Sequence, residues 1–222
     1  MPAFILMQNN EKKVRQVSFK SELLRKLIHI SSAVIPVSYF FLDKKIILEI
    51  LIPVFILLIL VEILKYRNDF IYNLYTRLFK HMLRSHEYDK RKIRMNGSSW
   101  LLLSEIICII FFPKLIAITG MLLLSLSDST SAIIGRIYGK KQYAPNRTYA
   151  GSLTFFVVGT LIVFAMPKYF YLTSEYIFGI AAVLVTTIVD GSNFPADDNF
   201  TIPIVSSLVL YGLYMFFLPS VL

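Results

Sequence analysis

The chain of 222 residues has few of the residues on which several classes of protein depend. It contains a single cysteine, Cys108, so it can form neither an intramolecular disulfide nor a metal site built from cysteines. It has no G-x-x-x-x-G-K-[ST] loop and no H-R-D or D-F-G motif, which excludes the common nucleotide-binding enzymes that carry them. No basic stretch precedes the first short apolar run, so we expect no cleavable signal peptide.

Apolar residues are abundant instead and make up 56% of the chain. They occur in blocks of about the length that a helix needs to cross a hydrocarbon core about 30 Å thick. We therefore predict an all-α fold, a polytopic membrane helix bundle of about seven transmembrane helices. Because no repeat or low-complexity linker divides the chain, we expect one domain over residues 1–222. The predicted spans are Leu27–Leu42, Ile46–Leu64, Ser99–Phe112, Leu115–Ser127, Gly151–Met166, Tyr176–Val189 and Phe200–Leu218. We expect the fourth to continue as a helix to about Gly139.

Basic residues divide unequally between the connections that these spans create. Stretches 11–26, 65–94 and 136–147 carry 19 of them, and the remaining connections carry only Lys44, Lys45, Lys114 and Lys168. This asymmetry predicts a cytoplasmic N-terminus and an external C-terminus. The membrane would be the plasma membrane of a prokaryote or the endoplasmic reticulum of a eukaryote. The same rule, with anionic headgroups, explains the net charge of +9, so we expect no nucleic acid partner.

Segment 65–94 is more than a loop, because its apolar residues recur at helical spacing. These are Phe70, Ile71, Leu74, Leu78, Phe79 and Met82, with Arg77, Lys80 and Arg84 among them. The pattern predicts an amphipathic helix in the cytoplasmic interface of the membrane. It would anchor the protein to headgroups or take part in substrate entry.

Three polar clusters lie on the predicted cytoplasmic side. In the first, Asp128, Ser131, Gly135 and Gly139 fall on one helical stripe. Its small residues allow close approach by either a neighbouring helix or a ligand. Four cations follow within twelve residues, namely Arg136, Lys140, Lys141 and Arg147. A carboxylate followed by cations suits a triphosphate bound through Mg²⁺, although small-residue helix packing beside a basic loop would give the same pattern.

The second cluster places Glu22, Arg25, Lys26 and His29 on one helical face, either as a basic flank of the membrane or as a phosphate contact. The third is the run Asp197, Asp198 and Asn199, which either caps the last helix or holds Mg²⁺ and accepts a proton.

Other polar residues mark the spans themselves. Glu105 lies in the middle of a span and is expected to face the interior of the bundle, and Asp190 closes the sixth span. The turn that starts at Asn96 reads as an N-cap followed by an interfacial tryptophan, Trp100.

These residues resemble a known family. The segments DSTSAIIGRIYGK (Asp128–Lys140) and RTYAGS (Arg147–Ser152) are similar to those of the CTP-using membrane lipid enzymes. Those enzymes are the dolichol, polyprenol and phytol kinases, the CTP-dependent diacylglycerol kinases and, more distantly, the phosphatidate cytidylyltransferases. The segments ELLRKLIH (Glu22–His29) and DDNFTIP (Asp197–Pro203) resemble the kinase branch.

The resemblance implies a membrane enzyme that transfers phosphate from CTP, with Mg²⁺, to the hydroxyl of a membrane lipid. The residues expected to bind Mg-CTP are Arg25, Lys26, Gly135, Arg136, Gly139, Lys140, Arg147, Gly151 and Ser152. Asp128, Asp197 and Asn199 would hold the metal ion, and Asp128 or Asp198 would take the proton of the hydroxyl. The family usually has a glutamate where this chain has Ala150, so either Asp190, Asp197, Asp198 or Glu105 supplies that carboxylate, or the activity or substrate differs from that of the family.

Two other functions are compatible with the sequence. A CTP:phosphatidate cytidylyltransferase would share the Asp128–Lys140 motif and act at the α-phosphorus of CTP. A transporter or scaffold without catalytic activity would use the polar stripe only to pack helices.

Overall fold

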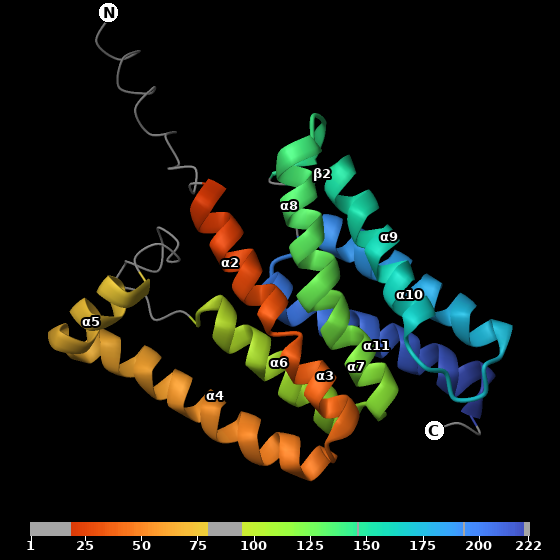
Figure 1. Ribbon diagram of the computed structural model, residues 1–222, viewed down its shortest axis with the longest axis horizontal. Coiled ribbons are helices and arrows are strands. Elements are labelled where there is room, and N and C mark those ends of the chain that lie inside the picture. Colours follow the sequence, from red (N-terminus) through yellow and green to blue (C-terminus); the bar gives the residue numbers. More distant parts are fainter. Residues whose placement is uncertain (1–18, 80–94, 146, 193, 220–222) are drawn as a thin grey trace, which may run out of the picture.

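The computed structural model describes residues 19–79, 95–145, 147–192 and 194–219, which form a helical bundle with one short pair of strands (Figure 1). In chain order the elements are α2 (Phe19–Ser31), α3 (Val34–Phe41), α4 (Lys44–Arg67), α5 (Asp69–Phe79), α6 (Gly97–Phe111), α7 (Lys114–Leu122), the π-helical turn η2 (Leu123–Asp128), α8 (Ser129–Tyr138), β1 (Gln142–Ala144), β2 (Arg147–Thr148), α9 (Tyr149–Ala165), α10 (Thr173–Gly191) and α11 (Asp198–Phe217). The all-helical prediction is confirmed; the antiparallel pair β1–β2 is a small addition to it.

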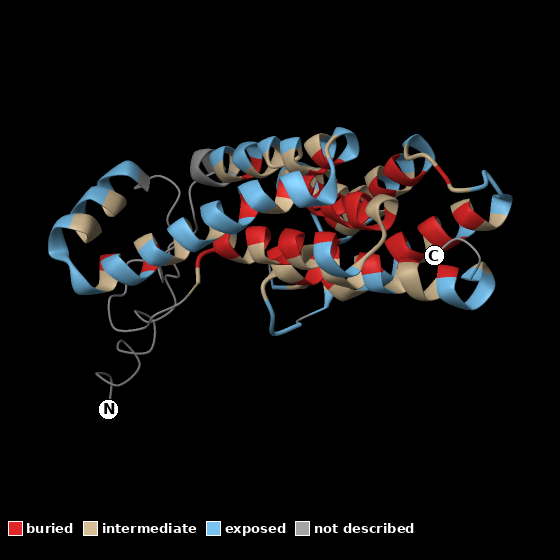
Figure 2. Cartoon of the chain, turned by 90° about the horizontal axis from the view of Figure 1, so that it is seen from below, coloured by how far each residue is buried: buried red, intermediate tan, exposed pale blue. Residues whose placement is uncertain are grey.

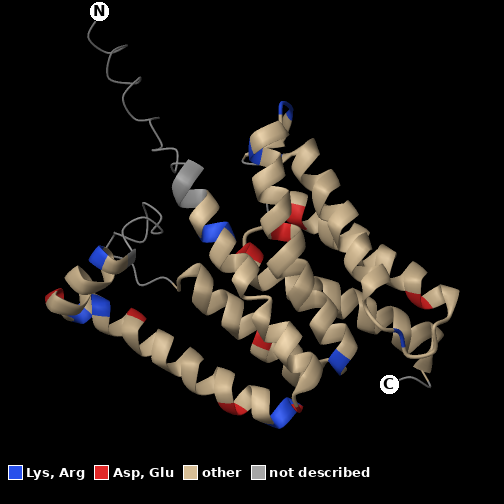
Figure 3. Cartoon of the chain, in the orientation of Figure 1, with Lys and Arg blue, Asp and Glu red and all other residues tan. Residues whose placement is uncertain are grey.

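Four helical stretches are long and apolar enough to cross a membrane, namely Lys44–Arg67, Lys114–Tyr138, Thr173–Gly191 and Asp198–Phe217. Long uncharged stretches of these helices are visible in Figure 3. The protein is therefore a membrane protein. Helices α6 and α9 are apolar but shorter, so the count of seven spans stays a prediction. The expected continuation of the fourth block past Asp128 is confirmed, since α7, η2 and α8 follow one another without a break.

The continuous helix Lys114–Tyr138 is the centre of the bundle. Of its most apolar 18 residues, 72% are buried inside the protein, compared with 17% for α4. Buried residues accordingly gather in the interior, while exposed ones line the outer helix faces (Figure 2). On α4 the exposed side chains are aliphatic, such as Ile50 and Leu57, which suits contact with lipid.

Two irregular helical turns meet inside the bundle. The first is the break between α2 and α3, and the second is η2, whose wider turn ends at Asp128. The hydroxyls of Ser32 in the break and Ser125 in η2 lie 3.0 Å apart. Single π-helical turns are rare and occur mostly at functional sites. In this protein the π-helical turn η2 shifts the helix backbone directly beside the buried carboxylate of Asp128.

Helix α11 contains Pro203, which has no N–H to donate to the carbonyl of Asn199 one turn earlier. The hydroxyl of Ser104 on α6 donates to that carbonyl instead, at 2.8 Å. Because Pro203 leaves this carbonyl without a helical donor, the hydroxyl of Ser104 connects α6 to the first turn of α11. Helix α7 also packs closely on α11, because a Cβ at Gly120 would lie 2.8 Å from the carbonyl oxygen of Pro203.

Three lysines at the predicted external end bind helix C-termini. Lys44 donates to the carbonyl of Ile110 at 2.7 Å, and Lys114 donates to that of Leu42 at 3.0 Å. Such contacts satisfy carbonyls that have no helical partner and complement the helix dipole.

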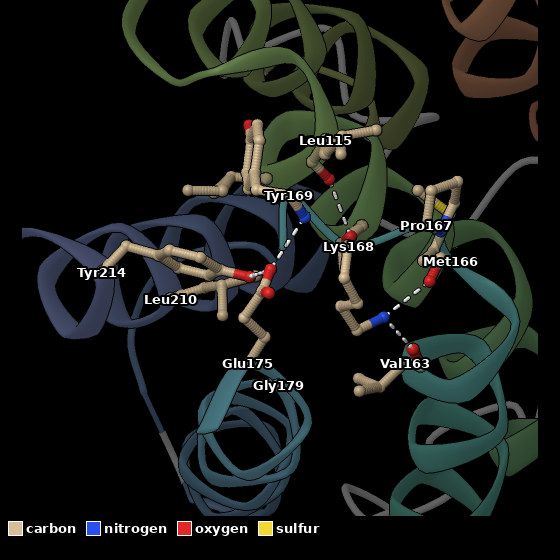
Figure 4. A pocket seen from close by; sticks show the side chains of 12 residues that line it. Leu115, Val163, Met166, Pro167, Lys168, Tyr169, Glu175, Gly179, Leu210 and Tyr214 are labelled. Atoms are coloured by element: carbon tan, nitrogen blue, oxygen red, sulfur yellow. Dashed lines mark hydrogen bonds between the residues drawn. The ribbon is translucent and has the colours of Figure 1, made fainter. Parts of the chain in front are cut away.

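The third of these lysines lines a small cavity at the same end (Figure 4). Lys168 donates to the carbonyls of Val163 and Met166, at 2.5 and 2.6 Å, and burial lowers the pKa of its amine. Glu175 accepts the backbone N–H of Tyr169 and the hydroxyl of Tyr214 nearby, at 2.7 and 3.0 Å. These hydrogen bonds fix the conformation of the connection between α9 and α10.

Within segment 65–94, α4 ends at Arg67 and α5 follows over Asp69–Phe79. Lys80, Met82 and Arg84 lie outside the described residues. A helix is present over Asp69–Phe79, and its amphipathic character stays a prediction. Phe70, Leu74 and Leu78 are exposed along it. Its place in the membrane interface stays a prediction.

Candidate active site

A buried ion pair joins α2 to the π-helical turn. The Nζ atom of Lys26 lies 2.5 Å from Oδ2 of Asp128, and the two residues are 5% and 1% exposed. Asp128, the first residue of the stripe, thus contacts the helix that carries Lys26. A buried charge without a partner would be strongly destabilising, so each residue compensates the charge of the other.

A second set of charges joins strand β2 to the end of α10 and to the start of α11. Arg147 Nη1 lies 2.9 Å from Oδ1 of Asp190 and donates a hydrogen bond to Oδ2 at 3.1 Å. Its Nη2 lies 3.9 Å from Asp198 Oδ2. Asp190 is buried, whereas the side chains of Arg147 and Asp198 are each 28% exposed, so this set opens towards the surface.

The two sets belong to one cluster. Lys26, Asp128, Arg147 and Asp198 all act electrostatically on Asp190. Beside Asp190 lies a cavity of about 220 Å³, lined by Arg147, Asp197, Asp198 and apolar residues of α10 and α11. Pockets that enclose a whole ligand usually measure about 300 to 1,000 Å³. This one is large enough for part of a nucleotide, such as its phosphates.

The start of α11 is organised by local hydrogen bonds. Asp197 is the N-cap of the helix and accepts the N–H of Asn199 at 3.0 Å, so the capping alternative is confirmed for Asp197. The side-chain amide of Asn199 donates to the carbonyl of Gly97 at 3.1 Å. Both side chains are thus used in placing the helix, and Asp198 is left as the carboxylate that meets Arg147.

The glycines of the stripe pack against a neighbouring helix. A Cβ at Gly135 would lie 2.8 Å from Oγ1 of Thr148 and 3.1 Å from Cα of Gly151. Thr148 is the N-cap of α9 and accepts the N–H of Gly151 at 3.1 Å. Close packing of α8 on α9, and with it the position of Arg147, therefore depends on these small residues. Direct contact between the glycines and a nucleotide stays a prediction.

Other predicted binding residues lie outside this cluster. Arg136 and Lys140 are exposed at the end of α8, two to three helical turns beyond Asp128. Ser152 shares a 2.6 Å hydrogen bond with the hydroxyl of Tyr143. Arg25 is half-buried on α2 next to Lys26, and Glu22 has a side chain outside the described part of the structure.

Sequence reasoning named two further residues of the cluster, Asp190 and His29, without assigning either a definite role in the site. Asp190 was predicted to close the sixth span and was one of four carboxylates named as a replacement for the glutamate missing at Ala150. His29 lies one turn beyond Lys26, and Asp128, Asp198 and Asn199 act on it. Glu105 is fully buried as predicted, and neither of its oxygens has a hydrogen-bond partner among the described residues.

A preformed metal site is absent from the described residues, since no three His, Cys, Asp or Glu side chains are grouped to hold an ion. Mg²⁺ in phosphate-transferring proteins usually takes one or two carboxylates and completes its shell with phosphate oxygens and water. Metal binding by the predicted ligands Asp128, Asp197 and Asn199 therefore stays a prediction.

A membrane helix bundle that encloses paired carboxylates and cations, with a polar cavity beside them, defines an integral membrane protein with a buried polar site. Its similarity to known proteins is consistent along most of the chain. An uncharacterised protein of Rickettsia prowazekii is 30% identical over 190 residues, covering 84% of this chain and 91% of the relative. CTP-dependent diacylglycerol kinase 1 of Saccharomyces cerevisiae is 29% identical over 215 residues, covering 86% and 73%. The enzyme of that name from Eremothecium gossypii is 25% identical over 222 residues, covering 89% and 68%.

No family model and no solved structure matches the chain. The relatives nevertheless cover most of the chain, and the chain belongs to the family of CTP-dependent membrane lipid kinases.

Proposed function

We propose that the protein transfers the γ-phosphate of CTP to the hydroxyl of a membrane lipid at the cytoplasmic face, with Mg²⁺. Diacylglycerol is the first acceptor to consider, because it appears in the names of the kinase relatives. The observation that carries the proposal is the cluster around Asp190, in which three ion pairs from five elements lie beside a polar cavity.

The charges of the cluster suit phosphate transfer. Lys26 and Arg147 are the cations nearest the carboxylates, and Arg147 can grip phosphate oxygens with both Nη atoms. Arg25, on the same helix as Lys26, would add a third cation. Catalysis of phosphate transfer consists mostly of positioning and charge neutralisation, so such a set can supply most of what the reaction needs.

In the proposed reaction the lipid hydroxyl oxygen forms a bond to the γ-phosphorus. The bond between that phosphorus and the β,γ-bridging oxygen breaks, and CDP leaves. Asp128 or Asp198 accepts the hydroxyl proton. When bound, Mg²⁺ would neutralise charge on the phosphates, and one or two of the carboxylates of Asp128, Asp190 and Asp198 would hold it. Asp190 also supplies a carboxylate to the Arg147–Ser152 segment, where Ala150 lacks one.

The test uses purified protein in lipid nanodiscs with CTP labelled at either the α- or the γ-phosphorus. We expect label from the γ position to enter diacylglycerol, with release of CDP. Label that enters lipid only from the α position would replace the kinase by a cytidylyltransferase. A panel with diacylglycerol, a polyprenol and phytol identifies the acceptor.

Matched carboxylate variants test the site. Asp128→Asn should abolish transfer, whereas Glu49→Gln should not, because Glu49 is exposed on α4 and its partner is Lys45 at 3.9 Å. Full activity in Asp128→Asn would remove Asp128 from the site.

A further inference from the structure

A second buried polar cluster surrounds Asn96, the residue before α6. Its backbone N–H donates to Glu62 Oε1 at 3.1 Å, its Oδ1 accepts from Lys65 at 3.2 Å, and its Nδ2 donates to the Tyr75 hydroxyl at 2.5 Å. Its carbonyl accepts the N–H groups of Ser99 and Trp100. Asn96 is 7% exposed, so a residue with every polar group satisfied is held in one position.

The partners of Asn96 come from elements that supply nothing to the candidate active site. Glu62 and Lys65 lie in the last turns of α4, and both are buried. Tyr75 lies on α5, with the Lys65 amine 4.6 Å from the centre of its ring. Glu62 also accepts the hydroxyl of Ser99 at 2.7 Å. Asn96 is the N-cap residue of α6, as predicted, but its side chain makes no capping hydrogen bond and bonds to α4 and α5 instead.

The residue after Asn96 touches the active-site helix. The carbonyl of Gly97 accepts the amide of Asn199 at 3.1 Å, and a Cβ at Gly97 would lie 2.6 Å from the same nitrogen. One turn on, Trp100 packs edge-on against Phe200, with ring centres 5.4 Å apart. The position of Asn96 thus sets how α6 meets the start of α11, where Asp198 lies.

We propose that Asn96 is a positioning residue of the kinase. Through Gly97 it fixes Asn199 and Asp198 beside Arg147, and through Tyr75 it makes that placement depend on α5. The exposed apolar side chains of α5 are Phe70, Leu74 and Leu78, which suit the headgroup region of a bilayer. The cluster therefore links the helix predicted to lie on the membrane surface to the carboxylate of the site. This proposal rests on the function proposed above.

Trp100 is the only tryptophan of the chain, so its fluorescence reports directly on the contact between α6 and α11. Tyr75→Phe removes the hydroxyl that holds Asn96 and keeps the ring beneath Lys65. We expect a red shift of Trp100 emission, stronger quenching by acrylamide, and a kcat about threefold to tenfold lower at unchanged KM for CTP. Asn96→Ala should give a larger effect in the same direction.

Tyr171→Phe is the matched control, because Tyr171 is exposed at the other end of the bundle. Both readouts should stay at wild-type values in that variant. Wild-type emission and wild-type kcat in Tyr75→Phe and Asn96→Ala would overturn the proposal. If the wild type transfers no phosphate to any lipid, the proposed function fails, and the emission of the variants still decides whether α5 positions the α6–α11 contact.

Discussion

At the scale of single residues, a structural role of the Lys26–Asp128 pair can be separated by experiment from the proposed role in catalysis. Each is almost fully buried, and the contact of 2.5 Å joins residues 102 positions apart in the chain. A structural role requires only that the positive and negative charges balance each other. A role in binding phosphate and metal requires the charges themselves. Variants that remove the charges together separate the two roles.

Lys26→Met leaves the carboxylate of Asp128 buried without a partner and should destabilise the protein by about 3 to 5 kcal/mol. The double variant Lys26→Met with Asp128→Asn removes both charges and should regain most of that stability. Neither variant should transfer phosphate. Thermal unfolding in detergent and the labelled-CTP assay measure the two effects. A double variant as unstable as the single one would show that more than charge balance holds α2 in place.

Ser104 offers a second test at this scale. Ser104→Ala leaves the carbonyl of Asn199 without a donor and should cost about 1 to 3 kcal/mol. Pro203→Ala restores a backbone N–H one turn later, which can bond to that carbonyl. We therefore expect Pro203→Ala to offset most of the loss caused by Ser104→Ala when the two are combined. Additive losses in thermal unfolding would contradict this account.

At the scale of helices and strands, the crossing of α8 over α9 determines where Arg147 lies. Gly135→Ala should lower stability, because its Cβ would lie within 3.1 Å of Cα of Gly151 and closer to Thr148. Gly212→Ala is the control: nothing lies within 4 Å of its Cβ, and alanine is favoured over glycine in a helix by up to about 1 kcal/mol. Thermal unfolding should therefore move in opposite directions. A loss of stability in Gly212→Ala equal to that in Gly135→Ala would leave the glycine packing without support.

Periodicity and block length are local properties, and they predicted the helices and the side of the bundle that carries each polar cluster. The stripe from Asp128 to Gly139 was also visible, but its neighbour was not. Whether a small residue packs on a helix or on a ligand depends on what lies opposite it. Gly135 packs on Gly151, which is 16 residues further along the chain. The partnership of Arg147 with Asp190 is equally non-local. Asn96 looked like an ordinary N-cap because its true partners lie 21 to 34 positions earlier in the chain.

At the scale of the whole molecule, the short helices α6 and α9 join opposite ends of the bundle. Gly97 lies beside Asn199 at the active-site end, whereas Ile110 lies beside Lys44 at the other end. For α9, Thr148 contacts Gly135 and the last turn lies next to Lys168. A helix of 17 residues is about 26 Å long, slightly less than an average hydrocarbon core, and local thinning of the bilayer accommodates such a difference.

This arrangement predicts which side of the membrane each connection faces. Lys141 and Tyr171 are exposed, and α9 is the only helix of the described chain between them. Cys108 is fully buried, so background labelling should be low in variants with one added cysteine. A membrane-impermeant maleimide should label Tyr171→Cys in intact cells and Lys141→Cys only after permeabilisation. The reverse labelling pattern would show that the predicted orientation of the chain in the membrane is wrong. Labelling of both from one side would show that α9 does not span, and the lysines that bind helix C-termini would then share a face with the active site.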